Sequence, residues 1–199
     1  MRLKPFTTDY LEAGCDEAGR GCLAGPVVAA AVILPKGYKN KLINDSKKIN
    51  ESTRILLEKD IKQNALAWAV GVANVREIEK INILNASILA MHRAIDKLKT
   101  IPKHLAIDGN KFKPYPEINH SCIIKGDAKF MNIAAASIIA KTHRDHLMCE
   151  LDKGFPSYEW KTNKGYPTKK HREAILKNGY CEHHRRTFRL LPKQIKLAI

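Results

Sequence analysis

Short apolar segments alternate with longer amphipathic ones along this chain, and this order constrains its fold more than any other feature. The clearest strand candidate is Val27–Leu34, which is built from β-branched and small apolar residues after a Gly-Pro pair. Four other short segments read as strands: 11–16, 66–73, 104–108 and 121–125. Strands come first, helices and strands then alternate, and the end is mostly helical. We therefore expect an α/β domain with a helical C-terminal end.

The longer segments carry helix signals. Asn50 is expected to cap a helix that runs to about Asn64, with Ile55, Leu56 and Ile61 facing inward. Thr168 is expected to cap a last helix that stops at Gly179. Two further helices are expected over 133–151 and through a set of apolar residues spaced by three and four: Leu84, Ile88, Met91, Ile95 and Leu98.

Three of the expected strands run into carboxylates. Asp16-Glu17 closes the first segment, Asp108 closes the segment at 104–108, and Asp127 follows the segment at 121–125. Neighbouring strands would bring these carboxylates together, and their repulsion would then favour a divalent cation. Ligands that are all oxygen suit Mg²⁺ or Mn²⁺, and two such ions can hydrolyse a phosphodiester. For each acid alone a turn or helix-cap role stays open, most of all for Asp108 before Gly109-Asn110.

A glycine loop follows the first acidic pair. Gly19-Arg20-Gly21 would let the backbone approach a ligand closely, and its N–H groups and the Arg20 fork could contact phosphate or a sugar hydroxyl. The loop lacks the glycine spacing of a dinucleotide-binding turn, and the chain has no phosphate-binding loop of the NTPase type. A plain turn with a solvated Arg20 is the alternative.

The charge balance predicts a polyanionic partner. The 199 residues carry a net charge of +15, and from Lys161 to the end eleven Lys or Arg face two acids. That stretch is therefore expected to face phosphates. A basic surface with no partner remains the alternative. For His143, His183 and His184 we expect surface or capping roles.

Cysteine usage and the N-terminus bear on location. None of the five cysteines forms a closely spaced pair, and the number is odd, so we expect buried reduced thiols rather than disulfides or a zinc site. The start lacks the apolar core of a signal peptide, and the longest apolar run is far too short to cross a bilayer. A cytoplasmic location without membrane contact is expected.

At this point the sequence resembles the ribonuclease HII family. Residues 14–27, GCDEAGRGCLAGPV, resemble the opening signature of that family, and residues 125–145, KGDAKFMNIAAASIIAKTHRD, resemble its longest motif. Shorter matches follow the family order: Asp45-Ser46-Lys47, Ile107-Asp108-Gly109, Lys164-Gly165-Tyr166-Pro167-Thr168 and His184-Arg185-Arg186-Thr187-Phe188. Together they span nearly the whole chain.

The resemblance implies a ribonuclease H-like fold: a five-stranded mixed sheet flanked by helices, in a single domain over 1–199 with a basic helical substrate-binding segment from about 155. It implies metal binding by Asp16, Glu17, Asp108 and Asp127, contact of Gly19-Arg20-Gly21 with the ribonucleotide and its 2′-OH, stacking of Tyr166 on a sugar, and phosphate binding by Ser46 and Lys47. The substrates implied are RNA–DNA hybrids and duplex DNA with embedded ribonucleotides, cut with Mn²⁺ or Mg²⁺ by a protein expected to be a monomer.

Two rivals and one departure complete the sequence-based prediction. Ribonuclease HIII is disfavoured because its glycine loop lacks an arginine like Arg20, and because the motif at Gly14 leaves no room for its extra N-terminal domain. A non-catalytic basic nucleic-acid-binding protein fits the charge equally well but not the acids. Phe130-Met131-Asn132 departs from the family pattern and is expected to alter substrate contacts near Asp127.

Overall fold

A computed structural model describes residues 3–43 and 49–191, and its centre is a five-stranded mixed sheet with the order β3-β2-β1-β4-β5. The strands are β1 (Glu12–Ala18), β2 (Val27–Ile33), β3 (Ala67–Ala73), β4 (His104–Asp108) and β5 (Asn119–Ile123). The first three pair antiparallel, whereas β4 runs parallel to β1 and β5 runs parallel to β4. The predicted ribonuclease H-like sheet is confirmed.

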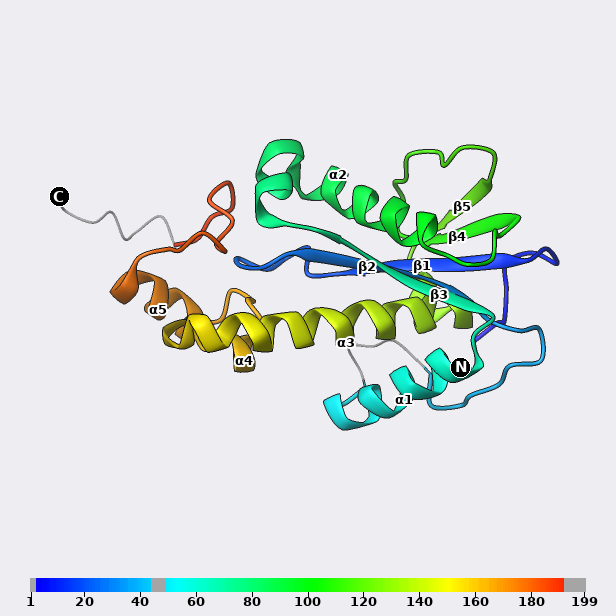
Figure 1. Cartoon of the computed structure of the whole chain (residues 1–199), viewed down its shortest axis with the longest axis horizontal. Coiled ribbons are helices and arrows are strands. Elements are labelled where there is room, and N and C mark those ends of the chain that lie inside the picture. Colours follow the sequence, from blue (N-terminus) through cyan, green and yellow to red (C-terminus); the bar gives the residue numbers. More distant parts are fainter. Residues whose placement is uncertain (1–2, 44–48, 192–199) are drawn as a thin grey trace.

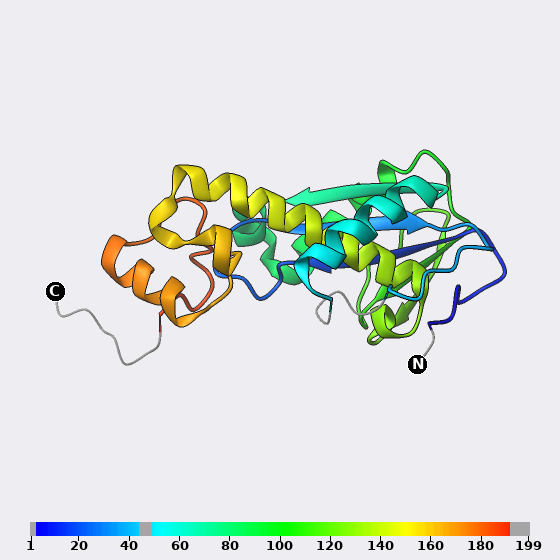
Figure 2. The same cartoon turned by 90° about the horizontal axis from the view of Figure 1, so that it is seen from below.

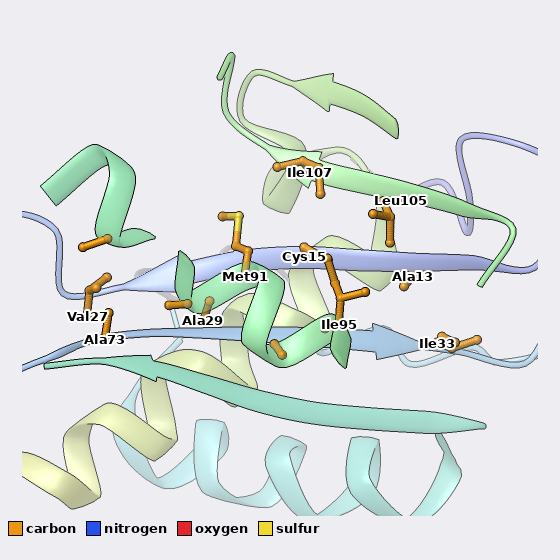
Figure 3. Close-up of a cluster of buried hydrophobic side chains, with 14 of the residues drawn as sticks. Ala13, Cys15, Val27, Ala29, Ile33, Ala73, Met91, Ile95, Leu105 and Ile107 are labelled. Carbon is orange, nitrogen blue, oxygen red and sulfur yellow. The ribbon is translucent and has the colours of Figure 1, made fainter. Parts of the chain in front are cut away.

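Helices cover both faces of this sheet (Figures 1 and 2). The helix α2 (Val75–Asp96) lies on one face, and α1 (Glu51–Asn64) and α3 (Met131–Gly154) lie on the other. Figure 3 shows the core under α2, where Met91 and Ile95 face Cys15 of β1 and Ile107 of β4. The strands next to the acids are thus fixed by apolar packing on both sides.

On the opposite face α3 comes close to β1 at Gly14. A Cβ atom built at Gly14 would lie 2.3 Å from the Asn132 carbonyl carbon, so only glycine allows this approach. The small residues Ala134, Ala135 and Ala136 of α3 are completely buried in the same layer. The close approach brings the first half of α3 under the acidic end of the sheet.

Helix ends follow the capping signals. The Asn50 side chain accepts a hydrogen bond from the Thr53 N–H, and the Thr168 side chain accepts one from the His171 N–H. The last helix, α5 (Lys169–Asn178), ends at Gly179 with a positive φ of 75°. These predicted caps are confirmed.

Two helices differ in detail from the prediction. Leu56 is 65% exposed, and Leu57 takes the inward position in α1. The helix α2 begins at Val75, well before Leu84, because Asn74 and Glu77 form a capping box, and it contains a kink at Asn82.

The strand β5 lies two residues earlier than predicted. Its polar residues Asn119 and His120 pair with β4, whereas Ile124 is 61% exposed. Pairing with β4 decides the register here, and the apolar residues of the segment do not.

The C-terminal part gathers around the far end of α3. It contains the short 3₁₀ helix η2 (Pro156–Tyr158), α4 (Trp160–Asn163) and α5, with an apolar cluster around the fully buried Trp160. In both views this part lies beside the β1–β2 loop (Figures 1 and 2).

The sequence also predicted that the cysteines are buried free thiols and that no segment spans a membrane. All five cysteines are free thiols; Cys15 and Cys22 are buried, but Cys122 is exposed, so burial of every thiol was wrong. Among the helices of the described ranges, none combines the length and hydrophobicity that crossing a membrane requires.

Candidate active site

The parallel pairing of β1 and β4 brings the predicted acids of these strands together. Cys15 pairs with Ile107, so Asp16 and Asp108 follow at neighbouring positions on adjacent strands. Both lie inside their strands rather than after them. Glu17 and Asp108 line one small pocket between the carboxyl ends of β1 and β4 and the helix α2.

Asp16 lies in a position that is unfavourable for its charge. Its residue is 5% exposed, and burial raises the pKa of its carboxyl well above the usual range, with further contributions from the negative charges of Glu17 and Asp108. A hydrogen bond from the Ser137 side chain and one of 2.7 Å from the Glu17 N–H act in the opposite direction. Three carboxylates close enough to raise a pKa in this way would be relieved by a cation.

Asp127 reaches the same region by another route. It lies in the 3₁₀ helix η1 (Gly126–Ala128), after Lys125 with its positive φ of 56°, and so does not continue β5. The Gly126 N–H donates a 2.7 Å hydrogen bond to Asp108 Oδ1. The residue directly before Asp127 therefore contacts that carboxylate. Asp127 is 7% exposed.

The glycine loop begins directly beside the acids. Arg20 Nη1 lies 3.1 Å from Glu17 Oε1, and the Arg20 side chain is 50% exposed. Gly19 has a φ of +97°, which favours glycine, whereas a Cβ at Gly21 would meet no atom within 4 Å. Gly21 therefore leaves open space in front of the loop.

Tyr166 lies next to this loop. Its side chain interacts with Cys22, and burial together with the Cys22 thiol raises the pKa of the Tyr166 phenol. Lys141 Nζ lies 5.4 Å from the centre of the Tyr166 ring, and the ring is partly exposed. The loop and the aromatic residue that the sequence proposed for substrate thus share one surface.

The donor set suits a hard cation. Asp16, Glu17 and Asp108 offer oxygen only, the ligand type that Mg²⁺ and Mn²⁺ take. Within the part of the chain that the structure describes, no three His, Cys, Asp or Glu side chains already surround a common point as metal ligands do. One carboxylate oxygen of Glu17, Oε1, contacts Arg20 in this structure.

The remaining predictions concern residues that the structure does not describe or that are buried. Ser46 and Lys47 lie outside the described residues. Asn132 is completely buried, and its amide donates a 2.6 Å hydrogen bond to Glu12. The expected influence of Phe130-Met131-Asn132 on substrate contacts near Asp127 stays a prediction. His184 is 1% exposed and lies 3.2 Å from His171, which excludes the surface role. Its Nδ1 accepts a hydrogen bond from the Cys181 N–H, as the capping alternative expects.

Sequence analysis missed three buried residues around the site. Ser137 holds Asp16 from α3, and Arg144 and Arg185 lie behind the glycine loop. Arg185 had been counted among the charges expected to face phosphates, but its residue has no exposed surface. Ser137 could have been found, because it follows the small residues that bring α3 against β1.

Comparisons with known proteins agree on one family. The family model described as ribonuclease HII matches residues 13–191. A ribonuclease HII of Bacteroides fragilis is 60% identical over 191 residues, which cover 96% of this chain and 95% of that protein. The structure of the PCNA:RNase HII complex from Archaeoglobus fulgidus matches with a TM-score of 0.75 and 25% identity, covering 92% of this chain and 97% of that one.

A more distant structure shares the fold. Bst-RNase HIII in complex with Mn²⁺ matches with a TM-score of 0.70 and 19% identity, covering 90% of this chain and 67% of that one. The Mn²⁺ belongs to that protein, and at this identity the match supports the fold alone.

Proposed function

The chain belongs to the ribonuclease HII family, and from this premise we propose that it is an endonuclease that cuts RNA in RNA–DNA hybrids and nicks duplex DNA on the 5′ side of an embedded ribonucleotide. The observation that carries the proposal is the burial of Asp16 beside Glu17 and Asp108 on the adjacent strands β1 and β4. An acidic cluster on a chain with a net charge of +15 suits a metal-dependent nuclease.

The acids have a defined role in this proposal. Asp16, Glu17, Asp108 and Asp127 would hold Mn²⁺ or Mg²⁺, and these ions, when bound, supply the activation of water and the stabilisation of the leaving oxygen. The Ser137 hydrogen bond and the Glu17 N–H orient Asp16. The Gly126 N–H fixes Asp108. The products would carry a 3′-hydroxyl and a 5′-phosphate.

Substrate recognition is assigned to the surface beside the acids. Gly19-Arg20-Gly21 would contact the backbone at the ribonucleotide, where the 2′-OH is the group that distinguishes RNA from DNA. Tyr166 would stack on the sugar that follows. Its ring is held beside the glycine loop by contact with Cys22. Ser46 and Lys47 are proposed to bind phosphate on the resemblance alone.

The direct test uses an end-labelled DNA duplex with one ribonucleotide, together with an identical duplex made only of DNA. We expect one nick 5′ to the ribonucleotide with Mg²⁺ or Mn²⁺, no nick in the control duplex, and no reaction in EDTA. Asp16→Asn should keep duplex binding and lose the nick. A nick that persists in this variant would remove Asp16 from the site.

The second candidate is a basic protein that binds nucleic acid without cutting it. Its support is the charge of the C-terminal part, where Lys169 and Lys170 have side chains that are 91% and 77% exposed. Binding of both duplexes with no nick in either metal would favour this candidate.

The setting of the activity is proposed as well. We propose a monomer in the cytoplasm that removes ribonucleotides during DNA replication and repair. One catalytic domain would span residues 1–199, with the part from about 155 as its substrate-binding segment. Sedimentation of the free protein and of its duplex complex would test the stoichiometry.

A further inference from the structure

Two completely buried arginines lie behind the glycine loop. Arg144 comes from α3 and Arg185 from the C-terminal part, and both have no exposed surface. In the ranges 3–43 and 49–191, neither forms an ion pair with an acid. Buried charges without an acidic partner are costly, so their retention calls for a reason.

Their hydrogen bonds all go to backbone carbonyls, and most of these belong to the loop between β1 and β2. Arg185 donates from Nε to the Gly25 carbonyl at 3.0 Å and from Nη1 to the Arg20 carbonyl at 3.0 Å. Arg144 donates to three carbonyls at 2.8–3.0 Å, those of Ala24, Pro26 and Lys164. Bonds from a charged donor are stronger than those between neutral groups.

The loop is also tied to the C-terminal part through its backbone. The Leu23 N–H donates to the Gly165 carbonyl at 2.8 Å, and the Gly25 N–H donates to the His183 carbonyl at 2.9 Å. Arg185 therefore sits where the C-terminal part and the glycine loop join, and Gly165 directly precedes Tyr166.

The inward direction of the carbonyls sets the outward direction of the N–H groups. The two groups of one trans peptide point in opposite directions. Because Arg185 holds the Arg20 carbonyl inward, the Gly21 N–H points away from the core. No residue in the described ranges accepts a hydrogen bond from it, and the space beside Gly21 is open. This N–H therefore remains able to donate to a ligand.

Gly19 fits the same arrangement. A Cβ atom at Gly19 would lie 2.1 Å from Arg144 Nε, so the glycine makes room for the buried guanidinium. Burial and the nearby charge of Arg144 lower the pKa of Arg185 to about 10, which still leaves it protonated at neutral pH. Arg185 Nη2 is buried without a hydrogen-bond partner among the described residues. Two adjacent positive charges thus lie directly behind the loop.

We propose that Arg185, supported by Arg144, is a positioning residue for ribonucleotide recognition: it orients the Arg20–Gly21 peptide so that the Gly21 N–H faces the sugar–phosphate backbone at the ribonucleotide. This inference rests on the proposed nuclease function. A uniform charge contribution would help any duplex, whereas an oriented N–H helps the ribonucleotide duplex more. The two roles therefore differ in what they do to specificity.

The test compares Arg185→Met and Arg185→Lys with the unchanged protein. The measurements are KM and kcat on a duplex with one ribonucleotide, and the inhibition constant of the same duplex made only of DNA. We expect Arg185→Met to raise KM about tenfold, the effect of losing one or two charge-assisted bonds to the loop, and to change the inhibition constant less than threefold. Lysine keeps the charge but lacks the planar fork whose Nε and Nη1 reach the Gly25 and Arg20 carbonyls, so the KM of Arg185→Lys should lie between that of Arg185→Met and that of the unchanged protein.

Arg172→Met is the matched control. Arg172 also donates to backbone carbonyls, those of Arg189 and Leu190, but it does not touch the glycine loop. Because Arg172 lies in the C-terminal segment proposed to face phosphates, its loss should change KM and the inhibition constant by the same factor and leave their ratio unchanged. Thermal melting shows that each variant is folded, and Arg185→Lys serves as the test if Arg185→Met is not.

Three outcomes are distinguishable. A rise in KM without a rise in the inhibition constant supports the inference. Equal changes in both constants, or no change in a folded variant, would overturn it while the nuclease function stands. An unchanged protein that does not nick the ribonucleotide duplex would instead refute the proposed function, and the inference with it.

Discussion

Replacing Asp16 with asparagine should make the metal-free protein more stable while it abolishes cleavage. Asp16 is 5% exposed, and its charge is opposed by burial and by the carboxylates Glu17 and Asp108. Asparagine has nearly the same shape, and its side-chain oxygen can keep the hydrogen bond from the Glu17 N–H. The substitution removes the charge and leaves the packing.

The size of the effect follows from these contacts. Burying a charged group without a compensating partner costs on the order of 1–3 kcal/mol or more. Since Asp16 retains some compensation from Ser137, we expect Asp16→Asn to raise the free energy of unfolding by about 1–3 kcal/mol in EDTA. For a domain of about 200 residues each kcal/mol shifts Tm by about 2–4 °C.

Adding a divalent cation should reverse the order of stability. A ligand at about a hundred times its Kd stabilises the folded protein by about 2.7 kcal/mol. Excess Mg²⁺ should therefore raise the Tm of the unchanged protein strongly and that of Asp16→Asn weakly. Paired melting curves with EDTA and with Mg²⁺, together with the nicking assay, measure all three effects.

Two results would refute this reasoning. If Asp16→Asn melts below the unchanged protein in EDTA, then Asp16 stabilises the fold and is not held at a cost for function. If Mg²⁺ raises both melting temperatures equally, the ion binds somewhere other than the Asp16 cluster.

Three further predictions concern stability and the loop. Burial lowers the pKa of His184 to about 4, below about 6.5 in the unfolded chain, so the unfolded chain takes up the proton first as the pH falls. Urea titrations should therefore show that the free energy of unfolding decreases between about pH 6.5 and about pH 4, by at most about 3 kcal/mol. His184→Asn should flatten that pH dependence. Gly19→Ala should cost about 1–3 kcal/mol by melting, whereas Gly21→Ala, with open space at its Cβ, should cost less; equal losses would contradict the close contact at Gly19. Glu12→Ala should remove the acceptor of the buried Asn132 amide and lower the free energy of unfolding by about 1–3 kcal/mol, and a denaturation midpoint that does not move would show that this contact is not needed.

Much of the fold followed from local signals in the sequence. The strand Val27–Leu34 and the caps at Asn50 and Thr168 depend on residues close in sequence, and all three agree with the structure. The errors arose where distant contacts decide. The polar start of β5 is a strand only because β4 pairs with it. Leu56 and Leu57 are equally apolar, and only the packing of α1 distinguishes them.

The early start of α2 is a different kind of error. The pair Asn74 and Glu77 has the spacing of a capping box, so its signal was present in the sequence. The kink at Asn82 interrupts the periodicity that begins again at Leu84. A reading by periodicity alone therefore starts one segment too late, whereas a reading by caps would have found the true beginning.

The candidate site was also predictable only in part. The acids were predictable in part because two of them, Asp16 and Asp108, lie at the carboxyl ends of apolar segments, and parallel neighbours bring such ends together. The direction and order of the strands could not be read from spacing. The resemblance predicted a mixed five-stranded sheet but not this order. Asp127, which the sequence placed after the fifth expected strand, lies in a 3₁₀ helix that has no periodic signal.

The buried arginines show that a count of charges does not tell which basic residues face a ligand. A count of Lys and Arg assigns every such residue to the surface, because charged side chains are seldom buried. Arg185 satisfies backbone carbonyls of a loop that has no regular structure of its own, a partnership that joins residues 160 and 165 positions apart. The basic residues behind the net charge of +15 therefore have two roles. Exposed lysines and arginines can attract a duplex, whereas the buried Arg144 and Arg185 shape the glycine loop that is proposed to contact the ribonucleotide. Exposed lysines should govern the salt dependence of binding, whereas Arg185 should govern the preference for a ribonucleotide.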